Sequence, residues 1–303
     1  MRSKKDPLMN YRLQYWAVRL LAALATLFPV EVTDWVTRRF GDLSYLILSK
    51  RRKIAFENIT YAFGSALPDN RKKQITRSAF QSAALSMTEL FTVRKIKKTA
   101  RDRFKLFGNE SLEKAFAEKK GVVLVISHLG SWEYLSFLPF LTGQPWSVVV
   151  KDIKNPYLNE AINDMRRVMT VNPISKDSSI RTVLSELKKG RGVAILIDQW
   201  AGREGLWTEF FGEKTSTTSI PARLAEKTGC ALVPAYCLRK EPGRYEIHAE
   251  KAVAWDRNRP DWETVLTEQL NGILERQIRQ YPEQWLWGHR RWKEMPATVR
   301  NAE

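Results

Sequence analysis

Short runs rich in apolar and β-branched residues alternate with amphipathic stretches along much of this chain. The runs that predict strands cover residues 122–126, 146–150, 192–197, 231–237 and 244–249. They are too short for buried helices and contain the residue types that favour strands. Helical periodicity predicts helices over residues 158–169, 178–189 and 262–281. Strand, helix and strand in this order indicate an α/β fold, with a mainly parallel central sheet flanked by helices.

The N-terminal pattern is different, because apolar residues dominate residues 11–30 with few interruptions. The uninterrupted part, residues 20–30, is shorter than the ~20 apolar residues that span a bilayer. A signal peptide is disfavoured because Arg19 interrupts the segment and no small-residue cleavage site follows it. We expect an amphipathic helix that lies on or dips into one membrane leaflet, with an ordinary core helix as the alternative. The predicted organisation is a membrane-associating segment over residues 1–30 and a single α/β domain over residues 31–303.

The chain is strongly basic, with 50 Lys and Arg against 33 Asp and Glu and a formal charge of +17. This balance indicates an anionic partner: nucleic acid, an anionic membrane surface or acidic substrates. Residues 31–105 look helical and carry basic clusters at residues 50–53 and 94–98. These clusters suit solvated helix faces, phospholipid headgroups or an acidic carrier protein, and the sequence does not separate the three. Cys230 and Cys237 have no metal-ligand spacing around them, which favours free thiols in a reducing compartment.

The candidate chemistry lies where the first strand-like run ends. Residues 121–135 read GVVLVISHLGSWEYL, with His128 directly after the apolar run. Gly130 and Ser131 predict a turn and the start of a helix, with Glu133 in its first turn. The turn allows His128 and Glu133 to meet at the carboxyl end of the strand, where open α/β sheets bind ligands. Such a pair predicts a general base for a hydroxyl group; the alternative is a histidine with only a structural hydrogen bond.

Further candidates surround this pair. Backbone amides near Gly130 are expected donors to a developing oxyanion. Asp198 and Gln199 end the strand over residues 192–197 and are expected to line the same site. Arg290 and Arg291 lie in an aromatic and basic segment, and we expect them to bind acceptor phosphates through bidentate hydrogen bonds. The same composition also suits nucleic acid.

Other kinds of site find little support in the sequence. Metal catalysis lacks a second histidine at ligand spacing, and a serine hydrolase lacks its G-x-S-x-G elbow. No nucleotide-binding fingerprint is present either, so we expect no cofactor and no metal.

Several motifs in order resemble one known family. The H-x4-E sequence from His128 to Glu133 resembles the H-x4-D/E signature of glycerolipid acyltransferases. The wider sequence is similar to the bacterial lipid A biosynthesis late acyltransferases, which transfer lauroyl or myristoyl chains. The further matching segments are residues 51–59, 155–158, 198–199, 210–212 and 281–293. Together these motifs extend over most of residues 11–293, so the ordered set is far more specific than H-x4-E alone.

The resemblance implies an enzyme, an O-acyltransferase on the cytoplasmic face of a bacterial inner membrane, held peripherally or by one N-terminal anchor. It implies an acyl chain moving from acyl carrier protein to a hydroxyacyl group of a lipid A precursor of the Kdo2-lipid IVA type. His128 with Glu133 would be the catalytic dyad. In the family an arginine on the helix after the second strand assists, which corresponds here to Arg166 or Arg167. The role of Asp198 would be to orient that arginine or polar groups of the acceptor.

Two alternatives stay open. The first is an acyltransferase for another membrane lipid, with coenzyme A as the carrier of the acyl chain, which the same dyad would serve. The second is a basic nucleic-acid-binding protein in which His128 is structural. It is disfavoured because no helix-turn-helix, zinc-finger spacing or RNP-like strand is present, so we expect no nucleic acid partner.

Overall fold

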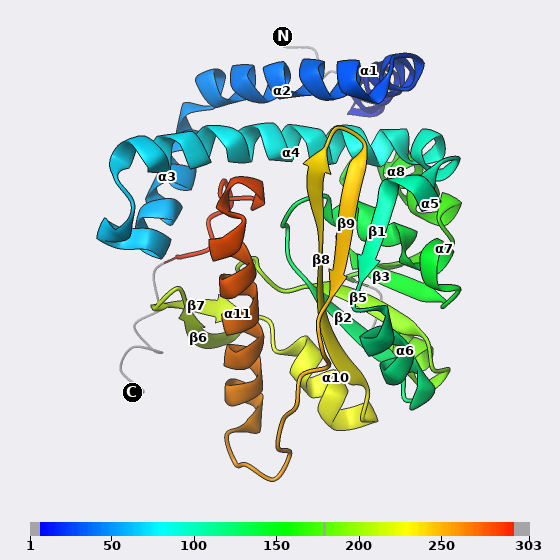
Figure 1. The fold of residues 1–303 in the computed structure, drawn as a ribbon, viewed down its shortest axis with the longest axis vertical. Coiled ribbons are helices and arrows are strands. Elements are labelled where there is room, and N and C mark those ends of the chain that lie inside the picture. The colour runs from blue at the N-terminus through cyan, green and yellow to red at the C-terminus, as the bar shows by residue number, and fades with distance from the viewer. Residues whose placement is uncertain (1–6, 178–179, 294–303) are drawn as a thin grey trace.

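The computed structural model describes residues 7–177 and 180–293. Its centre is a seven-stranded sheet with the strand order β1-β9-β8-β2-β5-β3-β4 (Figure 1). The strands of this sheet are β1 Phe104–Phe107, β2 Val122–Ile126, β3 Trp146–Val150, β4 Val171–Ser175, β5 Gly192–Leu196, β8 Ala231–Glu241 and β9 Arg244–Ala249. All neighbours run parallel except β8 and β9, which are antiparallel. The fold is therefore α/β with a mostly parallel sheet, as the sequence predicts.

Helices and a small hairpin complete the fold. The hairpin pairs β6 Leu206–Phe210 with β7 Glu213–Thr217. The α-helices are α1 Pro7–Leu27, α2 Val30–Ile47, α3 Ser49–Phe63, α4 Asp69–Lys97, α5 Ala100–Arg103, α6 Asn109–Ala117, α7 Leu138–Thr142, α8 Pro156–Val168, α9 Ile180–Lys188, α10 Ile220–Thr228 and α11 Trp262–Gln280. The 3-10 helices are η1 Gly64–Ala66, η2 Trp132–Phe137 and η3 Pro282–Gln284.

Strand β2 shows why the sheet is covered on both faces. Side chains alternate along a strand, so Val123 and Val125 pack into one core with α9, α10 and α11. Leu124 and Ile126 pack into a second core with α6, η2 and α7. A strand buried on both faces is apolar throughout, which is why this run is continuous rather than alternating.

Helix α4 joins the two cores. Ile75 and Ala79 in its first half belong to the core with α9 to α11, and Val93 and Ile96 in its second half belong to the other. Figure 1 shows α4 running across one end of the sheet, with α2 and α1 outside it. Helix α4 also contacts η2 and η3, which places it against the end of β2 where the candidate site begins.

The strand-like runs of the sequence are confirmed as β2, β3, β5, β8 and β9, with β8 extending further to Glu241. The expected helix over residues 178–189 is α9 from Ile180, and residues 178–179 lie outside the described part. Strands β1, β4, β6 and β7 carry weaker signals and were not predicted. Strand β4 contains Asn172 and Pro173 and lies at the edge of the sheet, where proline is tolerated.

The predicted N-terminal helix is present as α1, while residues 1–6 of the expected membrane-associating segment lie outside the described part. Across the described ranges, no helix combines the length and the apolar character needed to cross a bilayer.

Candidate active site

Strand register brings the central pair of the site together. Strands β2 and β5 are parallel neighbours, with Ile126 opposite Leu196. His128 and Asp198 each follow two residues later, so they leave the sheet side by side at its carboxyl edge. His128 Nδ1 lies 2.8 Å from Asp198 Oδ1, and the His128 backbone N–H donates to Asp198 Oδ2 at 2.8 Å. The carboxylate thus fixes both the backbone and the ring of His128.

Asp198 is almost fully buried, at 2% exposed, yet it is well provided with donors. Trp285 Nε1 donates to Oδ2 at 2.8 Å, in addition to the two contacts from His128. Burial by itself raises the pKa of Asp198, but the charge and hydrogen bonds of His128, with the bond from Trp285, outweigh it and lower the pKa to about 2. The ionised carboxylate accepts a hydrogen bond from Nδ1–H, which favours the tautomer whose Nε2 keeps its lone pair.

His128 lines a cavity of about 710 Å³, within the range of about 300–1,000 Å³ for small-molecule sites. Gln199 lines it too, and Gln199 Nε2 lies 3.3 Å from His128 Nε2 and donates to it. The ring nitrogen that does not face Asp198 is thus in contact with a second side chain of the cavity lining.

Glu133 does not meet His128 as the sequence analysis predicts. Its carboxylate binds Arg166 of α8 instead, accepting from Nη2 at 2.7 Å and from Nε at 3.1 Å. Among the described residues no hydrogen bond joins Glu133 to His128. Glu133 lies in η2 and lines the same cavity, and the carboxylate that binds the imidazole is Asp198.

The two arginines of α8 have different surroundings. Arg166 lines the cavity, and its Nη1 also donates to Asn163 Oδ1 at 3.0 Å. Arg167 lies on the exposed side of the helix, where it binds Glu160 and Asp164 at 2.7 Å each. Of the two, Arg166 is the one whose place fits the prediction.

The expected oxyanion donors near Gly130 are already used. Gly130 N–H donates to Gln284 O at 2.9 Å, and Ser131 N–H donates to Cys237 O at 2.8 Å. Gly130 has a positive φ of 64°, and a Cβ there would lie 2.0 Å from Cys237 O. This glycine is required by a tight turn against β8, so the expectation that its amide stabilises an oxyanion is wrong.

Arg291 is another correction. Its side chain is fully buried and donates to Ser216 O at 2.6 Å, Thr217 Oγ1 at 2.7 Å and Gln199 O at 3.2 Å. Burial lowers the pKa of this guanidinium to about 10. Since its donors hold the hairpin and the end of β5 from inside, Arg291 does not bind acceptor phosphates. Arg290 is exposed and remains a prediction.

The cavity also contains residues that the sequence analysis did not select. Lys151 and Lys176 follow β3 and β4, and Lys293 packs over the ring of Trp200 at 3.6 Å. The signal for the first two was their position after strands at the same edge. His289 also lines the cavity, and burial, with smaller contributions from neighbouring positive charges, lowers its pKa to about 4.

A smaller space continues behind the ion pair of Glu133 and Arg166. It measures about 30 Å³ and lies between the sheet and η2. Most of its lining is apolar, contributed by Leu124, Leu135, Leu138, Val148, Trp146 and Val171. Glu133 and Arg166 line both spaces, so this ion pair lies between the open cavity and the apolar core.

Within residues 7–177 and 180–293, no three His, Cys, Asp or Glu side chains lie close enough together to hold a metal ion. Cys230 and Cys237 are both free and buried.

An imidazole held by a buried carboxylate, at the carboxyl ends of parallel strands and beside a deep cavity, is the site of an α/β protein equipped for general-base chemistry. The comparison with protein families identifies which chemistry this is. The chain belongs to the bacterial lipid A biosynthesis acyltransferase family, whose model matches residues 2–294. It is therefore an enzyme that transfers acyl groups.

Individual relatives agree with this assignment. The lipid A biosynthesis palmitoleoyltransferase of Escherichia coli (strain K12) is 26% identical over 277 residues, covering 89% of this chain and 87% of that protein. The lipid A biosynthesis lauroyltransferase of the same strain is 25% identical over 309 residues, covering 94% of each chain. A phosphatidylinositol mannoside acyltransferase of Mycobacterium tuberculosis (strain ATCC 25618 / H37Rv) is 30% identical over 146 residues, covering 46% of each chain.

Proposed function

We propose that this enzyme moves a fatty acyl chain from a thioester donor to a hydroxyl group of a lipid A precursor, with His128 as the general base. The observation that carries the proposal is an imidazole that lines the cavity, with Nδ1 held by ionised Asp198 and Nε2 next to Gln199. This arrangement suits removal of a proton from a hydroxyl group.

The proposed reaction has two steps, attack by the acceptor hydroxyl and release of the thiol. The acceptor hydroxyl replaces the amide of Gln199 at His128 Nε2 and gives its proton to the ring as its oxygen attacks the thioester carbonyl. Asp198 stabilises the imidazolium that forms. The tetrahedral intermediate then collapses, the carbon–sulfur bond breaks, and the imidazolium returns the proton to the thiolate. The products are an ester and a free thiol, and no acyl-enzyme is needed.

Arg166 is the group that we assign to the oxyanion. Its guanidinium carries five N–H donors, and the described contacts use one each on Nε, Nη1 and Nη2. The remaining donors are available to a developing negative charge in the cavity. Glu133 then has the role of fixing the orientation of Arg166 through its two hydrogen bonds.

The shape and charge of the cavity support an anionic lipid substrate and an anionic donor. Lys151, Lys176 and Lys293 line it, while the one acidic side chain among the described lining residues is Glu133, which is already paired. The formal charge of +17 acts in the same direction over longer distances. We propose acyl carrier protein as the donor, with acyl-coenzyme A as the alternative, and exposed Arg290 as a contact for acceptor phosphate.

Helices α1 and α2 support a location at the membrane surface. They expose many large apolar side chains: Leu8, Met9, Leu13, Trp16, Leu20, Leu21, Leu24, Leu27, Val32, Trp35, Val36, Phe40, Leu43, Leu46 and Ile47. Asn155 ties this region to the site, because its Nδ2 donates to Tyr11 O at 2.9 Å while its Oδ1 caps the start of α8. We propose that these helices lie in the cytoplasmic leaflet of the inner membrane and place the cavity next to its lipid acceptor.

The decisive experiment measures acyl transfer from acyl carrier protein to a lipid A precursor by mass spectrometry of the product lipid. His128→Ala should lose about 10²- to 10⁴-fold in kcat, the range that general-base assistance contributes. His248→Ala is the matched control, since His248 stacks between Phe107 of β1 and Tyr236 of β8 and does not line the cavity. Turnover that survives in His128→Ala would refute the base assignment. Repeating the assay with acyl-coenzyme A identifies the donor.

Membrane association has its own test. Replacing Leu13, Trp16 and Leu20 together with serine should release the protein from vesicles that contain anionic lipid, because the buried apolar area drives such binding. Phe107→Ser, which changes an exposed aromatic residue on β1, is the control. Equal vesicle binding by the triple variant and the control would rule out the proposed membrane surface.

A further inference from the structure

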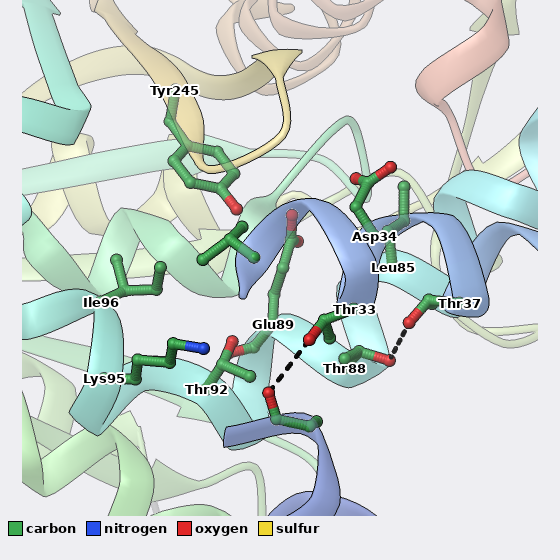
Figure 2. A pocket seen from close by; sticks show the side chains of 12 residues that line it. Thr33, Asp34, Thr37, Leu85, Thr88, Glu89, Thr92, Lys95, Ile96 and Tyr245 are labelled. Atoms are coloured by element: carbon green, nitrogen blue, oxygen red, sulfur yellow. Dashed lines mark hydrogen bonds between the residues drawn. The ribbon is translucent and has the colours of Figure 1, made fainter. Parts of the chain in front are cut away.

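A buried ion pair outside the cavity joins α4 to β8. Arg239 Nε and Nη2 donate to the two oxygens of Glu89 at 2.6 and 2.9 Å, and each side chain is 7% exposed. Figure 2 shows Glu89 on α4, close to Thr92 and Tyr245 and covered by the segment of α2 that carries Thr33. Neither Glu89 nor Arg239 lines the cavity of His128.

The guanidinium also binds the turn that follows His128. Arg239 Nη2 donates to Gly130 O at 2.8 Å and to Ser86 Oγ, and Ser86 Oγ itself donates to Gly130 O at 3.0 Å. Ser131 Oγ donates to Glu89 Oε1 at 2.9 Å. The ion pair therefore holds two successive residues of the turn, through the carbonyl of one and the hydroxyl of the other.

Gln284 extends this network to the peptide of His128. Its side-chain amide pairs with the backbone of Arg239, accepting from N–H and donating to O, each at 3.1 Å. The backbone carbonyl of Gln284 accepts a hydrogen bond from Gly130 N–H at 2.9 Å. Two residues later, Leu286 N–H donates to His128 O at 3.1 Å. The hydrogen bonds of Arg239, Gln284 and Leu286 together fix the backbone from His128 to Ser131.

Burying the charges of Glu89 and Arg239 costs free energy, so the presence of this ion pair needs an explanation. Apolar replacement of a buried ion pair is often neutral or stabilising, because desolvation offsets the attraction between the charges. Burial alone lowers the pKa of Arg239, but the carboxylate of Glu89 more than compensates and raises it. The guanidinium stays charged and keeps all its donors. Stability of the fold is therefore a weak explanation for the pair, and its contacts to the turn are a stronger one.

We infer that Glu89 and Arg239 are a positioning pair, which orders the turn at Gly130 and Ser131 so that the imidazole of His128 meets both Asp198 and the substrate. The inference rests on the proposed function of His128 as the base. It concerns residues that touch no substrate and act through the backbone of the turn.

The test compares Arg239→Lys, Glu89→Gln and the apolar double variant Glu89→Leu/Arg239→Met. Each should lower kcat by about 10- to 100-fold with little change in KM, since a misplacement of about 1 Å costs on the order of 10²-fold. Hydrogen exchange at the amides of Gly130 and Ser131, measured without substrate, should become faster. The double variant is expected to fold as stably as the wild type, which separates loss of position from loss of stability.

Glu186→Gln is the matched control. Glu186 is also a buried carboxylate, bonded to Arg191, Lys189 and Ser147, but it lies at the opposite edge of the sheet. This variant should keep the wild-type kcat and the wild-type exchange of the turn, even where its melting temperature falls.

Unchanged kcat and unchanged exchange in the folded double variant would overturn the positioning role. If Arg239→Lys does not fold, the double variant and Glu89→Gln give the same two readouts. Faster exchange in these variants, combined with full activity of His128→Ala, would instead show that the turn is positioned by the pair but that the proposed base is wrong.

Discussion

Two carboxylates hold side chains that line the cavity, and they differ in burial and in partner. Asp198 is buried at the end of β5, accepts three hydrogen bonds and orients the imidazole of His128. Glu133 lies in η2, is 15% exposed and holds the guanidinium of Arg166. Asp198 orients His128, which we propose as the base. Glu133 orients Arg166, which we assign to the developing negative charge.

The difference shows that nearness along the chain does not decide which residues meet. Glu133 is five positions from His128, yet it pairs with Arg166, 33 positions further on. Asp198 is 70 positions from His128 and contacts it twice. The register of β2 against β5 determines this contact, because both residues continue from an opposed pair of strand residues.

Asp198→Asn should produce the largest effect that separates the two carboxylates. An asparagine keeps the shape but not the charge, so the imidazolium loses its counter-ion and the tautomer of His128 is no longer fixed. We expect kcat to fall by about 10³- to 10⁴-fold, as the loss of a buried triad carboxylate does elsewhere. Steady-state kinetics of acyl transfer measure this. A loss smaller than that of Glu133→Gln would reverse the roles assigned here.

Glu133→Gln and Arg166→Lys should have intermediate effects. Both break the bidentate pair, and removing one hydrogen-bond donor from an oxyanion costs about 10²- to 10³-fold in kcat at most. We expect about 10- to 100-fold for Glu133→Gln, because Arg166 itself remains. Arg167→Lys on the exposed side of α8 is the control and should leave kcat unchanged. Equal losses for both arginine variants would show that α8, and not the cavity contact, matters.

The smallest expected effect concerns His289, which lines the same cavity as His128 and Glu133. Its pKa is about 4 in the folded protein and 6.5 ordinarily, so between these values the unfolded chain binds a proton that the folded chain does not. Stability should therefore fall as pH is lowered from 6.5 toward 4. Urea unfolding at pH 7 and pH 5 should show a smaller loss in His289→Gln than in the wild type. Identical losses would contradict the buried neutral imidazole.

Much of the sheet could be predicted from the sequence, because its central strands are buried on both faces and read as continuous apolar runs. Edge elements such as β1 and β4 could not, since their half-exposed positions carry polar residues. For the site, strand ends correctly placed His128 and Asp198 at one edge. Their direct contact needed the register between strands, which no local pattern contains.

Charge was a poorer guide than strand position. Arg291 looked like a surface cation that meets phosphate, whereas the fold turns its segment inward and gives its donors to backbone carbonyls. Sequence shows that such a residue is basic but not which way its backbone faces. Lys151 directly follows the predicted strand over residues 146–150, so its place at the same edge could have been predicted, because parallel strands end at a common edge.

The bond from Trp285 to Asp198 has a consequence for biosynthesis. His128 leaves the ribosome well before Trp285, whose indole helps to hold the carboxylate that orients the imidazole. A nascent polypeptide that extends only through α11 has the central sheet but lacks this hydrogen bond. The contact between His128 and Asp198 therefore gains its full support only after the residues that follow α11 have been made.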